Sequence, residues 1–168
     1  EFLDGVDAQA LTITNQNGFT TFRGASTAGQ SLITNNNASG TDFYGTSSGG
    51  TSTIINNQSG FTYFRETTSS ADAHIVNNGG GAATFFIQNG SAGNAVIDNN
   101  GGQARFYDSS TAGSATITNR SGGVTYFIGS SSADSATLVK DGNGRVDASY
   151  HTGALSIGAL SGQGRLLL

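Results

Sequence analysis

Few residues in this sequence have the types and spacing that catalysis needs. The two histidines are His74 and His151, and Asp72 lies two residues before His74. A histidine held by a carboxylate is part of a nucleophilic triad, but a triad is defined by its geometry and not by sequence position. The chain has no cysteine, which excludes a thiol nucleophile, a disulfide framework and a cysteine zinc site. We therefore predict a protein that is not an enzyme.

One segment has the acidic and glycine content of a calcium-binding loop. Asp141–Asp147 reads D-G-N-G-R-V-D, with an arginine near its centre. Calcium-binding nonapeptide repeats occur in many successive copies, whereas this segment occurs once. We interpret it as a turn and predict neither a bound metal nor another cofactor.

A fixed repeat organises the rest of the chain. Six phenylalanines recur at intervals of 21 residues: Phe22, Phe43, Phe64, Phe85, Phe106 and Phe127. A second, apolar column has spacings of 20 to 22 residues: Ile13, Ile33, Ile54, Ile75, Ile97, Ile117 and Leu138. An asparagine follows each isoleucine by two residues, and Lys140 takes this place in the last repeat: Asn15, Asn35, Asn56, Asn77, Asn99 and Asn119. A period in this range is typical of repeat architectures.

Each repeat contains two short stretches that alternate with period 2. In Ala115–Ile117 and Thr125–Phe127 the first and third side chains point to one face, as in β-strands. The Gly-, Asn- and Ser-rich segments between them are typical of turns. Equivalent residues are identical, which favours like stacking on like, with asparagine amides bonded between coils. We predict an all-β fold, a parallel β-helix (solenoid) with about seven coils of ~21 residues, roughly 35 Å long.

The residues beside the core phenylalanines form a candidate partner-binding face. If the alternation holds, aromatic and arginine side chains cover one exposed side of the solenoid: Tyr44, Tyr63, Arg65, Phe86, Arg105, Tyr107 and Tyr126. Exposed aromatic and arginine side chains are enriched at binding surfaces. The alternative is that these side chains stabilise the sheet through cross-strand pairs. The binding hypothesis predicts a glycan or a cell-surface or matrix protein as the partner.

A carbohydrate-active solenoid is the alternative function. Polysaccharide-degrading solenoids gather acidic and basic residues in one groove. Here the acidic residues occupy different positions of the repeat: Asp42, Asp72, Asp98, Asp108 and Asp134. A structural and interaction role is therefore the leading hypothesis.

Composition narrows the range of partners. The net charge is -4 and the seven Lys and Arg residues are scattered, so we expect no binding to nucleic acid. No apolar run is long enough for a membrane span. The last repeat and the first one leave coil faces without a neighbour, and we expect self-association through them.

The last segment of the chain carries a family resemblance. Gly153–Leu166 reads G-A-L-S-I-G-A-L-S-G-Q-G-R-L and resembles the L-x-I-G-x-L-x-G-x-G-x-L-x-L-G segment of passenger domains in Gram-negative autotransporters (type V secretion). Repeat units such as Ala115–Gly123 are similar to the Asn- and Gly-rich coils of the same passengers. The resemblance implies a right-handed β-helix outside the outer membrane, and functions such as adhesion. It supplies no shared catalytic residues.

The expected domain organisation is a single solenoid. We predict that 1–168 form one β-solenoid fragment of a longer protein, with regular coils over about 10–147 and an atypical coil over 148–168. The expected location is the cell surface or the secreted fraction.

Overall fold

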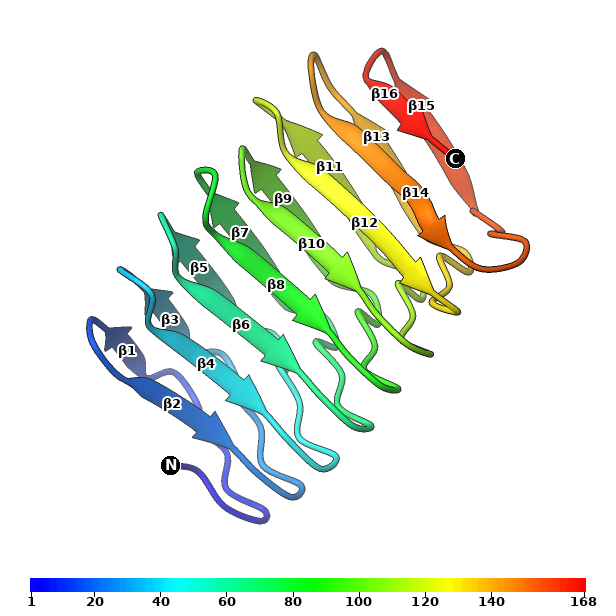
Figure 1. The fold of residues 1–168 in the computed structure, drawn as a ribbon. Coiled ribbons are helices and arrows are strands. Elements are labelled where there is room, and N and C mark those ends of the chain that lie inside the picture. Colours follow the sequence, from blue (N-terminus) through cyan, green and yellow to red (C-terminus); the bar gives the residue numbers. More distant parts are fainter.

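The computed structural model describes all 168 residues as a right-handed β-solenoid (Figure 1). In Figure 1 the strands in front run to the lower right and those behind run to the upper left. Successive coils follow one another from the N-terminus at the lower left to the C-terminus at the upper right. This sense of rotation is right-handed. The chain contains no helix, and hence no helical segment of the length and apolarity that crossing a membrane requires. The predicted fold class is confirmed.

Sixteen strands form two parallel sheets of eight strands each. The odd sheet consists of β1 (Thr12–Asn15), β3 (Leu32–Asn35), β5 (Thr53–Asn57), β7 (His74–Asn78), β9 (Val96–Asn100), β11 (Thr116–Arg120), β13 (Thr137–Lys140) and β15 (Ala159–Gly162). The even sheet consists of β2 (Phe19–Phe22), β4 (Gly40–Phe43), β6 (Phe61–Phe64), β8 (Ala83–Phe86), β10 (Gln103–Phe106), β12 (Val124–Gly129), β14 (Arg145–His151) and β16 (Arg165–Leu167). Each coil therefore contributes one strand to each sheet.

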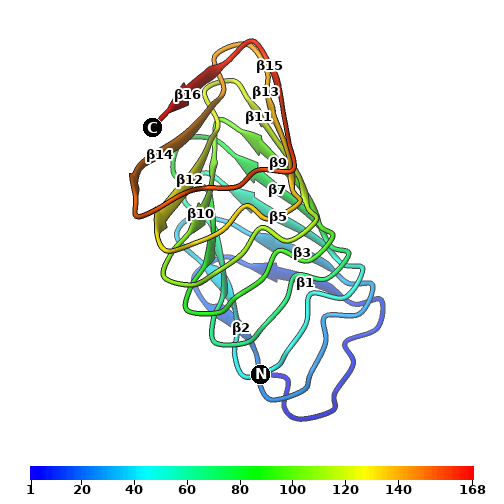
Figure 2. The same ribbon diagram turned by 90° about the vertical axis from the view of Figure 1, so that its right-hand side faces the viewer.

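A short third side closes each coil. Single bridges join one hydroxyl-bearing residue of each coil to the next: Thr27, Ser48, Ser69, Ser91, Thr111 and Ser132. The Oγ1 of Thr27 accepts a hydrogen bond from the N–H of Gly29, which has φ of 58°. The same turn recurs at Ser48, Ser69, Ser91 and Thr111. Because the turn is repeated, the coils have a similar outline from the N-terminus to the C-terminus (Figure 2).

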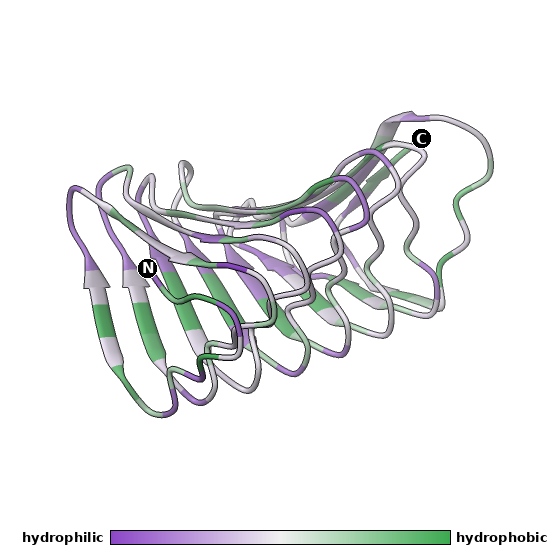
Figure 3. Cartoon of the chain, turned by 90° about the horizontal axis from the view of Figure 1, so that it is seen from below, coloured by the Kyte–Doolittle hydropathy of each residue, from purple (hydrophilic) through white to green (hydrophobic).

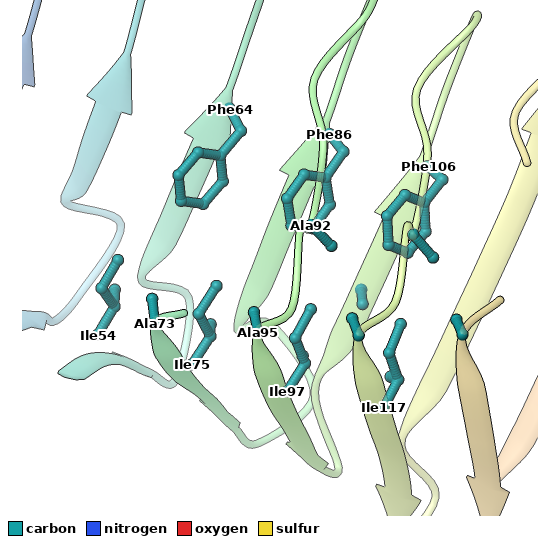
Figure 4. Close-up of a cluster of buried hydrophobic side chains, with 14 of the residues drawn as sticks. Ile54, Phe64, Ala73, Ile75, Phe86, Ala92, Ala95, Ile97, Phe106 and Ile117 are labelled. Atoms are coloured by element: carbon teal, nitrogen blue, oxygen red, sulfur yellow. The ribbon is translucent and has the colours of Figure 1, made fainter. Parts of the chain in front are cut away.

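The core is built from stacked identical side chains. The rings of Phe22, Phe43, Phe64, Phe86, Phe106 and Phe127 are fully buried, with centroids 4.6 to 5.1 Å apart and planes within 12° of parallel. A buried isoleucine or leucine column faces them from the odd sheet, with alanines between (Figure 4). Figure 3 shows this apolar band repeated from strand to strand. The two columns together form one continuous core cluster.

The fourth member of the phenylalanine column differs from the sequence-based prediction. Phe86, not Phe85, pairs with Phe64 and is buried. Three residues separate β5 from β6, whereas four residues, 79–82, separate β7 from β8, and two separate β9 from β10. The extra turn residue moves the alternation of β8 by one position, and the shorter turn restores it. For the same reason Thr84 points inward and Phe85 outward.

The sequence also predicts a column of small residues, which includes Ala28, Ala71, Ala92, Ala112 and Ala133, and the structure corrects it at one position. Ser70, not Ala71, aligns with Ala92 and is buried, because the bridge partner of Ser91 is Ser69. Ala71 instead occupies the turn position with φ of 53°.

The predicted asparagine ladder is present and is buried. The Nδ2 of each asparagine donates to the Oδ1 of the asparagine in the next coil at 2.7 to 2.9 Å, over the series Asn15, Asn35, Asn56, Asn77, Asn99 and Asn119. In most coils a buried threonine hydroxyl donates to the same Oδ1, as Thr62 does to Asn56 at 3.0 Å. These amides therefore keep their hydrogen bonds without water. Lys140 ends the ladder, with its Nζ 3.4 Å from the carbonyl oxygens of Ser161 and Gly162.

The last coil continues both sheets with less buried surface. β15 pairs with β13 and β16 pairs with β14, but their side chains are mostly exposed. The phenylalanine stack ends after Phe127, because Ala148 occupies the next buried position. Self-association through the end coils stays a prediction.

Truncating one stacked ring should destabilise the whole solenoid. Phe64 lies between Phe43 and Phe86, with centroids at 4.6 and 5.1 Å. We expect Phe64→Ala to lower the free energy of unfolding by about 3–5 kcal/mol, measured by urea denaturation. Phe19→Ala is the control, because Phe19 is 60% exposed, and its effect should stay below about 1 kcal/mol. Equal losses in the two variants would show that the buried stack does not hold the fold.

The buried asparagine ladder predicts that alanine substitutions at two adjacent asparagines differ in their effect on the free energy of unfolding. Asn56 is fully buried, whereas Asn57 is half-buried and bonds Asn36 and Asn78 in a second, outer ladder. Asn56→Ala leaves Asn35 and Thr62 with unpaired buried donors, so we expect a loss of about 2–4 kcal/mol in unfolding free energy. Asn57→Ala should cost less than about 1 kcal/mol, since water can replace the amide. A larger loss for Asn57→Ala in thermal or urea unfolding would refute the buried ladder as a source of stability.

Candidate functional site

The outward face of the even sheet carries two rows of side chains. The first row precedes each core phenylalanine and consists of Thr21, Asp42, Tyr63, Phe85, Arg105 and Tyr126. The second row follows each core phenylalanine and consists of Arg23, Tyr44, Arg65, Ile87, Tyr107 and Ile128. Of the predicted site residues, Tyr44, Tyr63, Arg65, Arg105, Tyr107 and Tyr126 lie on this face. Phe86 does not, because it is a core residue, and Phe85 takes its place.

The N-terminal part of the face is a continuous stack of alternating cations and rings. The guanidinium of Arg23 lies 4.7 Å from the ring centroid of Tyr44. Arg65 lies 5.5 Å from the same ring and 3.9 Å from the ring of Tyr63. Tyr63 in turn stacks on Phe85 at 4.5 Å. Contacts of this kind stabilise the sheet, so the cross-strand alternative accounts for part of this surface.

A second stack lies toward the C-terminal end. Arg105 lies 4.7 Å from the ring centroid of Tyr126, and Arg145 lies 5.9 Å from it on the next strand. The guanidinium of Arg145 also donates to the hydroxyl of Tyr126 at 2.9 Å. Sequence reasoning did not assign Arg145 to this face, because it treated the residue only as part of the Asp141–Asp147 segment.

The two stacks do not join. Phe85 and Arg105 are register partners on β8 and β10, but Arg105 turns away. Its Nε donates to the Oε1 of Gln103 at 2.6 Å and its Nη1 to the hydroxyl of Tyr107 at 3.1 Å. Where the stacks are interrupted, beside β8 and β10, the surface forms a shallow hollow of about 270 Å³. The hollow is lined by Tyr63, Phe85, Ile87, Tyr107 and Asp108. Sequence reasoning missed the hollow and three of its residues, Phe85, Ile87 and Asp108.

Asp42 is a partly buried acid on this face. Burial raises the pKa of its carboxyl above the ordinary value, and the charges of Arg65 and Arg23 offset only part of this effect. The Oδ1 of Asp42 has no hydrogen-bond partner, and the nearest guanidinium nitrogen of Arg65 is 3.8 Å away. Asp42 therefore lies under the Arg–Tyr stack as a poorly paired anion.

The odd sheet carries a separate ionic cluster around Asp98. The Nε2 of His74 is 2.9 Å from one oxygen of Asp98, and Arg120 donates to the other at 2.7 Å. Burial alone would raise the pKa of Asp98, but the bonds from His74 and Arg120 outweigh it and hold the pKa below its ordinary value. Asp72, the sequence neighbour of His74, instead accepts a bond from Asn94. No hydroxyl group is bonded to His74, so the cluster lacks a nucleophile.

One serine sequence matches the G-x-S-x-G nucleophile pattern, which the sequence-based reasoning wrongly took to be absent. Gly45–Gly49 reads G-T-S-S-G, but the catalytic form of this motif places an exposed serine between a strand and a helix. Ser47 is fully buried, in a turn that follows β4. Its hydroxyl donates to the carbonyl oxygen of Phe22 at 3.3 Å, so it serves the packing between coils.

The Asp141–Asp147 segment forms a turn followed by a strand. Residues 141–144 connect β13 to β14, and the N–H of Gly144 donates to the carbonyl oxygen of Asp141. The Asp141 carboxylate lies 3.8 Å from Arg120. No group of three or more His, Cys, Asp or Glu side chains is arranged to hold a metal ion.

The pKa shifts of Asp98 and Asp42 predict opposite effects of pH on the stability of the fold. The pKa of Asp98 is lowered in the folded state, so its stabilising contribution is present above the ordinary value of 3.8 and is lost as the pH falls through the folded pKa. The pKa of Asp42 is raised, so its contribution is favourable below 3.8 and is lost as the pH rises through the folded pKa. At pH 7 we expect Asp98→Asn to destabilise the fold by up to about 1 kcal/mol, and Asp42→Asn to leave it unchanged or more stable.

Denaturation of both variants at pH 7 and pH 3 checks these signs. The difference between each variant and the parent should shrink at pH 3, because Asp42 is then protonated in both states and the pH has fallen toward the lowered folded-state pKa of Asp98. A loss for Asp42→Asn that persists at pH 3, or a gain for Asp98→Asn at pH 7, would contradict the assignment.

Comparison with known proteins adds no family assignment. The sequence matches no protein-family model, and no curated protein matches it. The chain is a β-solenoid of stacked coils with a patterned outer face.

Proposed function

We propose that this chain is a non-enzymatic structural and interaction segment of a secreted surface protein, of the adhesin-like autotransporter passenger kind. The observation that carries the proposal is the unbroken stacking of the core. The phenylalanine stack and the asparagine ladder each run through six successive coils. Because each coil is bonded to both neighbours, the chain is suited to act as a stiff spacer.

The outer face of the even sheet supports the interaction part of the proposal. Its tyrosine and arginine side chains are only half-buried and follow one another along the rod axis. Side chains of these two types contribute most to binding at protein surfaces. A linear arrangement also favours many weak contacts with an extended partner, which raises avidity.

A carbohydrate-active domain is the second candidate function, and the hollow beside Phe85 is the observation that favours it. Glycoside hydrolysis generally needs two carboxyl groups on either side of the bond to be cleaved. Asp108 is the one acid among the residues that line the hollow. The hollow is therefore better suited to binding a sugar than to cleaving one.

An array of glycans and extracellular-matrix proteins tests the interaction surface. The purified chain is compared with the triple variant Tyr44→Ser/Arg65→Ser/Tyr126→Ser, whose positions lie outside the hollow. The matched control is Leu32→Ser/Val96→Ser, two exposed residues of the odd sheet. We expect selective binding by the parent and the control, and a loss of about tenfold or more in the triple variant.

Two outcomes would count against the proposal. Binding that is retained in the triple variant would remove the tyrosine–arginine rows as the interaction surface. Release of sugars from an arrayed polysaccharide would favour the carbohydrate-active alternative.

A further inference from the structure

The outer face of the even sheet is interrupted at a single step, and the interruption leaves one aromatic ring partly uncovered. Phe85 stacks on Tyr63 through one ring face. No aromatic ring or guanidinium covers its other face, because the guanidinium of Arg105 lies over Tyr126. The other two rings of the same row, Tyr63 and Tyr126, each contact a guanidinium.

We propose that the hollow beside Phe85 is a binding site for one neutral pyranose unit of a glycan. This site rests on the proposed interaction role of the even-sheet face, and its ligand class would be a neutral sugar. The hollow, about 270 Å³ in volume, is slightly smaller than the usual range of ligand pockets, roughly 300–1,000 Å³. A site of this size suits one sugar ring.

The lining of the hollow matches the two kinds of surface on a pyranose. The C–H groups on one side of the sugar ring are apolar and slightly positive, and a phenyl ring presents a negative face to them. Phe85 provides that ring face, and Ile87 and Tyr63 extend the apolar floor. The hydroxyl groups at the edge of the sugar need hydrogen-bond partners, which must come from the rim.

The rim supplies one donor and one acceptor. The hydroxyl oxygen of Tyr107 accepts a bond from Arg105 at 3.1 Å, which leaves its own proton free to donate. The carboxylate of Asp108 uses Oδ2 to accept the N–H of Gln88 at 3.0 Å, and its Oδ1 has no bonded partner within the chain. The two groups belong to adjacent residues at the C-terminal end of β10.

The charges around the hollow favour a neutral ligand. Asp108 forms no ion pair and supplies one negative charge. Arg105 is bonded to the rim residue Tyr107 and supplies one positive charge. A cationic ligand would be attracted by Asp108 but repelled by Arg105. An anionic ligand would be attracted by Arg105 but repelled by Asp108. A ligand that is polar but uncharged avoids both penalties.

Saturation-transfer NMR tests the site directly. The probes are methyl β-D-glucopyranoside, methyl β-D-galactopyranoside and methyl α-D-mannopyranoside, each at millimolar concentration, with glycerol as the non-binding reference. We expect transfer to at least one pyranoside, strongest at the ring protons of one face. Phe85→Thr should reduce that transfer by about fivefold or more, because Thr21 shows that threonine fits the same row.

The matched control is Phe19→Thr, which removes an exposed phenylalanine ring from the outer face of the even sheet outside the hollow. It should retain the transfer seen with the parent. Circular dichroism checks that both variants are folded. If Phe85→Thr does not fold, Asp108→Asn replaces it, because asparagine tolerates the positive φ of 57° at this position. This variant should lower the transfer by about twofold or more.

Three results would overturn the proposal. The first is no transfer to any pyranoside beyond that to glycerol, and the second is equal transfer to the pyranoside from the parent and from Phe85→Thr. The third is displacement of the pyranoside by tetramethylammonium chloride, which would identify a cation site instead. These results are distinct from failure of the proposed function. An array signal that depends on Tyr44, Arg65 and Tyr126 would still stand if the hollow bound no pyranoside.

Discussion

The stacking of like side chains at the spacing of β-strands is the constraint on which the rest of this structure depends. Parallel strands lie about 4.8 Å apart, and the buried phenyl rings are 4.6 to 5.1 Å apart. A flat ring and a planar amide both fit that spacing. Each can therefore repeat in every coil, the ring by contact and the amide by hydrogen bonds. The core of the protein is in effect one cross-section repeated along an axis.

The same constraint determines what the surface can do. A residue that points outward in one coil lies beside its equivalents in the next, so side chains with complementary faces assemble into rows. On the even sheet this produces arginine–tyrosine contacts between coils, such as Arg23 over Tyr44 at 4.7 Å. A row of this kind is extended and nearly flat. It becomes a local site only where the regular pattern is broken, as it is between Phe85 and Arg105.

Much of the fold could be predicted from the sequence, because repetition amplifies a weak pattern. The 21-residue period, the strand alternation and the asparagine ladder were all recoverable, and the hand followed from a resemblance. The exchange of Phe85 for Phe86 was not predicted. Both residues are phenylalanine, and the shift depends on one extra residue in the Gly79–Ala82 turn. An exact 21-residue spacing therefore selected the wrong ring.

The sites were harder to predict than the fold, because they depend on diagonal contacts between coils. His74 bonds Asp98, which is 24 residues away, and not its neighbour Asp72. The hollow exists because the side chain of Arg105 turns toward Gln103 and Tyr107. Neither the choice of a rotamer nor the coil in which a partner lies is encoded in a repeat pattern.

Deletion of one complete coil tests most directly the claim that each coil is held only by its neighbours. Removal of residues 44–64 joins Phe43 to Arg65 and would place Phe43 against Phe86, with the asparagine ladder continuous from Asn35 to Asn77. The account predicts a folded β-protein with a lower free energy of unfolding and, by small-angle X-ray scattering, a length reduced by about 4.8 Å. An unfolded product, or one more aggregated than the parent chain under the same conditions, would contradict it, because the stacked coils would then not be interchangeable units.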